Sequence, residues 1–222
     1  RPLPTALLAL AIPFGASPLA AGEIVRYTFP SEALGRDYPY TVYLPDGYGE
    51  RGLDYPTLYL LHGSFGDEND WAVDGGVQRS ADRLIAAGEI PPAVIVMPGS
   101  ESWWVDGYNE PAETAFVEDL IPHVENAYRV IAEREGRVIG GLSAGGYGTV
   151  NLVLEHPELF AAGAALSPAS YVPVPPESSS GNRHPAYLDE SGEFDPDKWK
   201  SLNYTAYIDG YSFPRFFIKI FT

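Results

Sequence analysis

Short apolar runs, separated by polar and turn-forming stretches, recur along the chain and predict the strands of a sheet. Residues 24–29 and 38–44 are rich in aromatic and β-branched side chains, and the turn-forming stretch between them predicts an antiparallel pair. Continuous apolar runs of about five residues are typical of strands that are buried on both faces of a parallel sheet. Such runs occupy residues 56–61, 93–97, 137–142, 161–166 and 216–221.

Apolar residues at helical spacing alternate with these strands in three stripes. In the second stripe Phe116, Leu120 and Val124 lie four residues apart. Pro122 falls between them and is expected to kink or break the helix, because it lacks a backbone donor. The alternation predicts an α/β fold with a mostly parallel central sheet and helices on both faces. The stripes lie within residues 77–85, 116–128 and 144–154.

Two segments fall outside this alternation. Residues 1–22 hold a leading Arg, an apolar stretch and small residues, as a signal peptide does, although three prolines interrupt the stretch. The alternative is an apolar linker, so we expect the folded domain to occupy residues 23–222. Residues 168–210 are rich in turn-forming residues and too long for an idle connection, which leaves either a mobile surface loop or a flap over a site.

Charge and composition exclude several classes of function. The 222 residues carry 14 Lys and Arg against 30 Asp and Glu, and a net charge of −16 disfavours binding to nucleic acid or to an anionic membrane. No apolar run reaches the roughly 18 residues of a membrane span. The lack of cysteine excludes thiolate chemistry, and no His–carboxylate group has the spacing of a metal site. We therefore expect neither a metal nor another cofactor.

A motif at the end of a predicted strand is the strongest indication of chemistry. The sequence Gly141-Leu142-Ser143-Ala144-Gly145 has the G-x-S-x-G pattern, with a predicted strand before it and a predicted helix after it. In that context the pattern forms a nucleophile elbow, a tight turn that lifts the serine hydroxyl above the sheet. The N-terminus of the following helix favours negative charge beside the serine. The alternative is a glycine-rich turn that only connects strand to helix.

A second motif, His62-Gly63-Ser64, ends the buried strand 56–61. A His-Gly pair alone is weak evidence for an oxyanion loop. Together with the Ser143 motif and several other segments, however, it occurs in an order that resembles that of one family. These are the α/β-hydrolase esterases of the feruloyl and acetyl xylan esterase type, relatives of S-formylglutathione hydrolase and the mycolyltransferases. The resemblance covers roughly residues 24–221. The matching segments are residues 62–64, 68–71, 94–98, 116–129, 140–148 and 156–161.

The resemblance implies that Ser143 is a nucleophile and that the backbone N–H groups of Ser64 and Ala144 form an oxyanion hole. It also implies a Ser–Asp–His triad whose acid follows the strand at residues 216–221 and whose His follows a further helix and strand. The given chain ends before both, so we expect a domain that lacks the C-terminal helix–strand portion. The strand from Phe216 to Phe221 would then have an open edge available for self-association.

None of the four His residues matches the family's catalytic position. His62 belongs to the His-Gly motif, His123 lies on a predicted helix, and His156 precedes a turn after the elbow helix. His184 lies in the irregular segment 168–210 and is the least unsuitable substitute base, since a base must reach the nucleophile.

Aromatic residues gather in the loops that are predicted to follow strands. Trp71 follows the His-Gly motif, and Trp103, Trp104 and Tyr108 follow the strand 93–97. Loops at the carboxyl ends of strands bind ligands in α/β sheets, and aromatic faces suit sugars or phenolic acyl groups. We therefore expect Trp71 and Trp104 to bind substrate, with packing against the core as the alternative.

The sequence as a whole predicts a serine carboxylic-ester hydrolase that is secreted or periplasmic and forms an acyl-enzyme on Ser143. The resemblance implies acyl or feruloyl esters of plant polysaccharides, or small-molecule esters, as substrates. One alternative is an acyltransferase or thioesterase with the same fold. The other is a truncated or non-catalytic esterase-like domain, which the missing acid and His favour for the chain as given.

Overall fold

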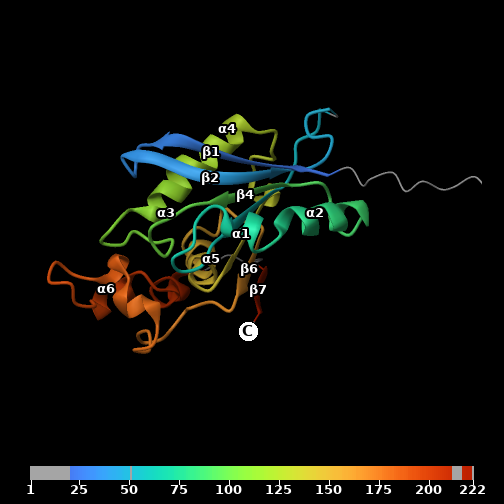
Figure 1. The fold of residues 1–222 in the computed structure, drawn as a ribbon. Coiled ribbons are helices and arrows are strands. Elements are labelled where there is room, and N and C mark those ends of the chain that lie inside the picture. Colours follow the sequence, from blue (N-terminus) through green and yellow to red (C-terminus); the bar gives the residue numbers. More distant parts are fainter. Residues whose placement is uncertain (1–20, 51, 212–216, 222) are drawn as a thin grey trace, which may run out of the picture.

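The computed structural model describes residues 21–50, 52–211 and 217–221, and in them a seven-stranded sheet forms the centre of the molecule (Figure 1). Its strands are β1 (Glu23–Ser31), β2 (Arg36–Leu44), β3 (Thr57–Leu61), β4 (Val94–Pro98), β5 (Arg137–Leu142), β6 (Ala162–Leu166) and β7 (Phe217–Phe221). Their order is β1-β2-β4-β3-β5-β6-β7. β1 and β2 are an antiparallel pair and β2 runs antiparallel to β4, while the other neighbours are parallel. The expected mostly parallel sheet is confirmed.

Helices cover both faces of this sheet, as expected. On one face α2 buries Val77 and Ala81 against Tyr43, Ile95 and Met97. The opposite face packs against the π-helical segment η1, α4 and α5 in the main core. The α-helices are α1 (Asp70–Val73), α2 (Val77–Ala86), α3 (Ala112–Thr114), α4 (Ile121–Ala127), α5 (Ala144–Glu155) and α6 (Pro196–Ser201), and η1 spans Ala115–Leu120. The 3-10 helices are Arg134–Gly136, Ser180–Arg183, Pro185–Tyr187, Tyr204–Ala206 and Ile208–Gly210.

Of the kink or break that the sequence predicts at Pro122, a break does not occur, because the helical region continues through the proline. The helix changes to π-type hydrogen bonding over η1, where the Ile121 N–H donates to the Phe116 carbonyl five residues earlier. It then resumes as α4 with Pro122 in its first turn, where a missing backbone donor costs little. The wider π turn therefore lets the chain pass the proline.

Residues 168–210, which we call the cap, form a packed layer beside α5 (orange in Figure 1). Trp199 of α6 is fully buried and stacks on Tyr147 of α5 with ring centroids 5.1 Å apart. The Tyr147 hydroxyl donates to the Leu202 carbonyl at 2.6 Å, which adds a polar tie between helix and cap. The alternative of a mobile surface loop does not fit this segment, because it carries its own aromatic core.

Two expectations concern residues that the structure does not describe. The signal-like or linker stretch falls mostly within residues 1–20, and Phe216 precedes the described part of β7. Within the described ranges, no helix combines the length and apolar character needed to cross a bilayer.

Candidate active site

Ser143 occupies the sharp junction between β5 and α5. Its backbone has φ 57° and ψ −111°, a conformation that is strained for a residue with a side chain. A Cβ built on Gly141 would lie 2.3 Å from the Gly145 carbonyl oxygen, and one built on Gly145 would lie 2.2 Å from the Leu61 carbonyl oxygen. Both flanking glycines are thus required by close backbone contacts. The predicted strand–turn–helix elbow is confirmed.

Hydrogen bonds from three directions hold the elbow in place. The Ser143 N–H donates to the Leu166 carbonyl of β6 at 2.9 Å. The Ser143 carbonyl accepts from the N–H of Tyr147 at 2.9 Å and from that of Ala169 in the cap at 3.0 Å. The strained backbone is thereby fixed, and the half-buried side chain stays at the surface of the elbow.

The loop after β3 passes directly beside the serine. A Cβ built on Gly63 would lie 3.7 Å from the Ser143 Cβ. Within the described part of the chain, neither the Ser64 N–H nor the Ala144 N–H has an acceptor. For Ala144 the reason is its place at the start of α5, where the first N–H groups have no partner in the helix. Both predicted oxyanion donors are free, and their convergence on one oxygen stays a prediction.

His62 shapes this loop, and both of its ring nitrogens form hydrogen bonds with groups other than the serine. Its ring is buried, which lowers its pKa and favours the neutral form. The neutral tautomer with the proton on Nδ1 donates to the Gly63 carbonyl at 2.8 Å, and its Nε2 accepts from the Ser100 N–H at 3.0 Å. His62 is therefore a positioning residue that fastens the loop to the segment after β4.

Trp104 also supports this loop, which corrects the expectation that it binds substrate. Its side chain is 1% exposed, and its indole Nε1–H donates to the His62 carbonyl at 3.2 Å. The positive φ of 65° at Trp104 turns the chain so that the ring enters the core beside Phe116. An indole without an open face offers no surface to a ligand.

Trp71, the other predicted binding residue, lies at the edge of a small hollow. This hollow of about 340 Å³ is also lined by Gly63, which belongs to the loop beside Ser143, and by Leu142, which directly precedes Ser143. The indole Nε1–H of Trp71 donates to the Leu61 carbonyl at 3.1 Å, which fixes the ring. Trp71 is half-buried and so keeps part of its surface accessible near Ser143.

All four His residues are described, and none has a hydrogen bond to the Ser143 hydroxyl. His123 stacks on Phe29 with centroids 3.9 Å apart, and His156 Nε2 lies 2.9 Å from Glu113 Oε1. His184 Nδ1 accepts from the Ala186 N–H at 3.3 Å. The neutral form of His184 therefore carries its proton on Nε2. Its Nδ1 could accept a proton from another group only after the hydrogen bond from the Ala186 N–H had broken.

Ligand atoms of Glu113, Glu155 and His156 all lie within 4.8 Å of one another, a cluster that local spacing did not reveal because Glu113 comes from a distant helix. Burial and, after it, the neighbouring Glu113 carboxylate raise the pKa of Glu155 to about 7. The hydrogen bond to Glu113 raises the pKa of His156. These hydrogen bonds account for the cluster, so we assign no metal to it.

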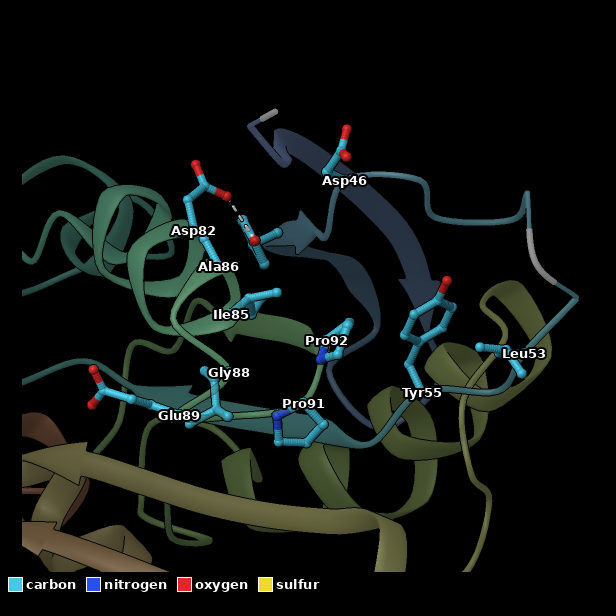
Figure 2. A pocket seen from close by; sticks show the side chains of 12 residues that line it. Asp46, Leu53, Tyr55, Asp82, Ile85, Ala86, Gly88, Glu89, Pro91 and Pro92 are labelled. Atoms are coloured by element: carbon cyan, nitrogen blue, oxygen red, sulfur yellow. Dashed lines mark hydrogen bonds between the residues drawn. The ribbon is translucent and has the colours of Figure 1, made fainter. Parts of the chain in front are cut away.

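A hollow lined by residues of several elements lies away from this site (Figure 2). Tyr55, Pro91 and Pro92 line it, and they precede β3 and β4, whereas Ser143 and the His62 loop follow their strands. Asp82 of α2, which accepts a hydrogen bond from Tyr43 at 2.8 Å, closes its other side. Because catalytic groups gather at the carboxyl ends of the strands, this hollow of about 600 Å³ is not part of the candidate site.

Two features of the site had no signal in the sequence. The Ser180 hydroxyl of the cap donates to the Ser64 hydroxyl at 3.0 Å, across 116 residues of chain. Phe65 follows Ser64 with φ 62° and a ring that is 79% exposed. Neither a long-range hydroxyl contact nor a positive φ at a Phe follows from periodicity.

Comparisons with known proteins agree with this geometry. The family described as "Putative esterase" matches residues 31–201. An endo-1,4-beta-xylanase/feruloyl esterase of Xylanibacter ruminicola is 36% identical over 162 residues, which are 68% of this chain and 22% of that protein. An esterase of Mycobacterium tuberculosis is 35% identical over 153 residues, which are 65% of this chain and 32% of that protein.

Solved structures show the same fold. A ferulic acid esterase superposes with a TM-score of 0.70 at 29% identity, over 88% of this chain and 71% of that chain. An S-formylglutathione hydrolase of Staphylococcus aureus superposes with a TM-score of 0.66 at 21% identity, over 93% of this chain and 80% of that chain. The chain spans less than a third of the length of the xylanase and the mycobacterial relative. It belongs to the esterase family and has the α/β-hydrolase fold.

Proposed function

We propose that this chain carries the nucleophile and oxyanion hole of a serine carboxylic-ester hydrolase. The observation that carries the proposal is the strained backbone of Ser143, which lies between β5 and α5 beside two free N–H groups. Strain of this kind persists where the surrounding structure enforces it, and it is concentrated at functional sites. The names of the relatives, which include feruloyl esterase and acetyl esterase, favour the same reaction.

The reaction proceeds through an acyl-enzyme. The Ser143 Oγ attacks the ester carbonyl carbon as its proton leaves to a base, and the carbonyl oxygen becomes an oxyanion. The N–H groups of Ser64 and Ala144 stabilise that oxyanion, and the N-terminus of α5 adds a favourable dipole. The C–O bond to the alcohol breaks as the alkoxide takes the proton. Water then attacks the acyl-enzyme, which releases the acid and restores the hydroxyl.

A serine hydroxyl needs a base to become a strong nucleophile. The resemblance assigns this role to a His, oriented by an Asp, at positions after β7, and we propose that arrangement for the natural protein. Hydrogen bonds already occupy His62 and His156, and they hold His184 in a tautomer unsuited to the task. These hydrogen bonds support a base for Ser143 other than His62, His156 or His184.

For the substrate we propose an acyl or feruloyl ester on plant polysaccharide, which a secreted or periplasmic protein would meet. The half-buried Trp71 beside Gly63 and Leu142 gives the site an aromatic wall, which suits a sugar or a phenolic ring. Two relatives have xylanase in their names, which also supports a polysaccharide ester as the substrate. Trp71 is thus the substrate-binding residue that we retain from the sequence.

The experiment is hydrolysis by the natural gene product that contains these residues, with 4-nitrophenyl acetate and methyl ferulate as substrates. Ser143→Ala is expected to reduce kcat by at least about 10³-fold and to abolish labelling by a fluorophosphonate. Ser201→Ala, an exposed serine on α6, is the matched control and is expected to retain full activity. Retention of more than a tenth of the activity by Ser143→Ala would refute the proposal. Added glycerol tests for acyl transfer, because a transferase yields a glycerol ester in place of the free acid.

A further inference from the structure

The loop after β3 presents a large apolar side chain in an unfavourable backbone conformation. Phe65 has φ 62°, and its ring is 79% exposed. It is the third residue of a turn that is closed by a hydrogen bond from the Gly66 N–H to the Gly63 carbonyl, at 3.2 Å. Turns with positive φ at this place favour glycine, because a Cβ there crowds the backbone. Phe65 strains the turn and gains little burial, so the fold itself does not account for it.

The strained residue lies next to the groups of the proposed reaction. Ser64, which precedes it, supplies one of the free N–H groups, and a Cβ built on Gly63 would lie in van der Waals contact with the Ser143 Cβ. Leu142, which is 45% exposed, adds a second apolar side chain directly before the serine. Phe65 and Leu142 are thus two exposed apolar side chains on the two segments that meet at Ser143, and the core requires neither.

The cap holds the loop in this position. The Ser180 hydroxyl donates to the Ser64 hydroxyl at 3.0 Å, and the His184 ring lies 6.1 Å from the Phe65 ring at an angle of 44°. His184 is itself fixed, because it is 6% exposed and lies 5.9 Å from the Trp103 ring. A ring on a loop that is fixed on one side is already positioned for a ligand, which reduces the entropy lost on binding.

We propose that Phe65 is a specificity-determining residue whose ring packs against an aromatic ring of the ester substrate. The inference rests on the proposed function in taking an ester at Ser143 as the ligand. Offset or edge-to-face aromatic pairs gain free energy beyond that of the buried area, so a Phe here selects for a ring over an aliphatic chain. The ring of the substrate belongs either to the acyl part or to the alcohol part, since both lie close to the same carbonyl.

The test measures binding without chemistry, in the Ser143→Ala protein, by chemical-shift titration. The probes are methyl cinnamate with a ring in the acyl part, benzyl acetate with a ring in the alcohol part, and methyl hexanoate without a ring. Phe65→Gly relieves the strain and is expected to stay folded. It should raise the Kd of one ring-bearing ester by about 5- to 10-fold and that of methyl hexanoate by less than about twofold. Phe65→Leu should also lose the preference for the ring.

Tyr27→Ala serves as the matched control, because Tyr27 is an aromatic side chain on β1 that is 44% exposed, and it should change no Kd. Equal weakening of all three esters by Phe65→Gly would overturn the proposal, and so would unchanged affinities or the absence of saturable binding of both ring-bearing esters. Binding in this background does not use the Ser143 hydroxyl. A failure of Ser143 as the nucleophile would therefore appear in hydrolysis and not in these titrations.

Discussion

Gly145 and Leu61 touch through their backbones, so that the first turn of the elbow helix rests on the end of β3. A Cβ on Gly145 would lie 2.2 Å from the Leu61 carbonyl oxygen and 2.6 Å from that of His62. These are main-chain atoms, which cannot rotate away as a side chain can. The contact joins the serine elbow to the loop that carries Ser64.

We therefore predict that Gly145→Ala destabilises the protein and separates the two halves of the site. Overpacking of this kind costs about 1–3 kcal/mol, which lowers the Tm of a domain of this size by about 2–12 °C. Gly210→Ala is the matched control, because a Cβ there meets nothing within 4 Å. Thermal unfolding followed by circular dichroism measures both, and equal Tm values for the two variants would contradict the prediction.

The cluster of Glu113, Glu155 and His156 predicts a pH-dependent stability. Burial and the Glu113 carboxylate raise the pKa of Glu155 from its ordinary 4.5 to about 7, and the hydrogen bond to Glu113 raises that of His156 above its ordinary 6.5. Both groups hold protons more tightly in the folded chain than in the unfolded one. Stability therefore falls as the pH rises from about 4.5 through 7, because the folded state binds more protons across that range.

Glu155→Gln should flatten this slope, since the amide does not titrate. Tm values at pH 5 and pH 8 give the measurement, and the difference between them should be smaller in the variant than in the natural sequence. Glu118→Gln, on the exposed side of η1, is the control and should leave the slope unchanged. An unchanged slope in Glu155→Gln would show that this cluster does not govern the pH dependence.

β7 is the last strand in the described sheet and pairs there with β6 alone. Unpaired N–H and C=O groups along such an edge recruit a further strand, either from the same chain or from a second copy. We predict a molecular mass that rises with concentration in light scattering. Ile220→Lys should reduce this rise, because Ile220 is 57% exposed on β7 and a Lys at an edge opposes pairing. A monomeric mass at every concentration would rule out pairing with a second copy.

Local patterns accounted for much of the fold because they coincide with what the sheet buries. Residues 137–142 were predicted as a strand and form β5 with the same bounds. Gly141, near the end of this strand, permits the close backbone contact with Gly145 in the elbow that follows. Pro122 was expected to kink or break its helix, and the helix is not interrupted there, because it changes to π-type hydrogen bonding just before the proline. Periodicity carries no information on that change. A kink at this point stays a prediction.

The direction of side chains in loops was beyond the reach of sequence reasoning. Trp104 was expected at the substrate, yet a positive φ turns it into the core to hold His62. No sequence pattern indicates a role for Phe65, although its exposed side chain and positive φ set it apart from the other aromatic residues near Ser143. The contact between Ser180 and Ser64 joins distant parts of the chain and depends on how the cap packs.

The last prediction concerns turnover by the 222-residue chain on its own. A nucleophilic serine depends on a base within hydrogen-bond reach, and no His of this chain has a hydrogen bond to the Ser143 hydroxyl. An oxyanion hole and binding without a complete triad leave roughly 10³–10⁴-fold catalysis over water, against about 10⁶-fold or more for a working enzyme. We expect barely measurable hydrolysis of 4-nitrophenyl acetate that Ser143→Ala changes little. A protein that also supplies the acid and the His should be far faster and should lose that gain with Ser143→Ala. Full turnover by the 222 residues would contradict this account, and His184→Ala would then show whether His184 releases Ala186 and serves as the base.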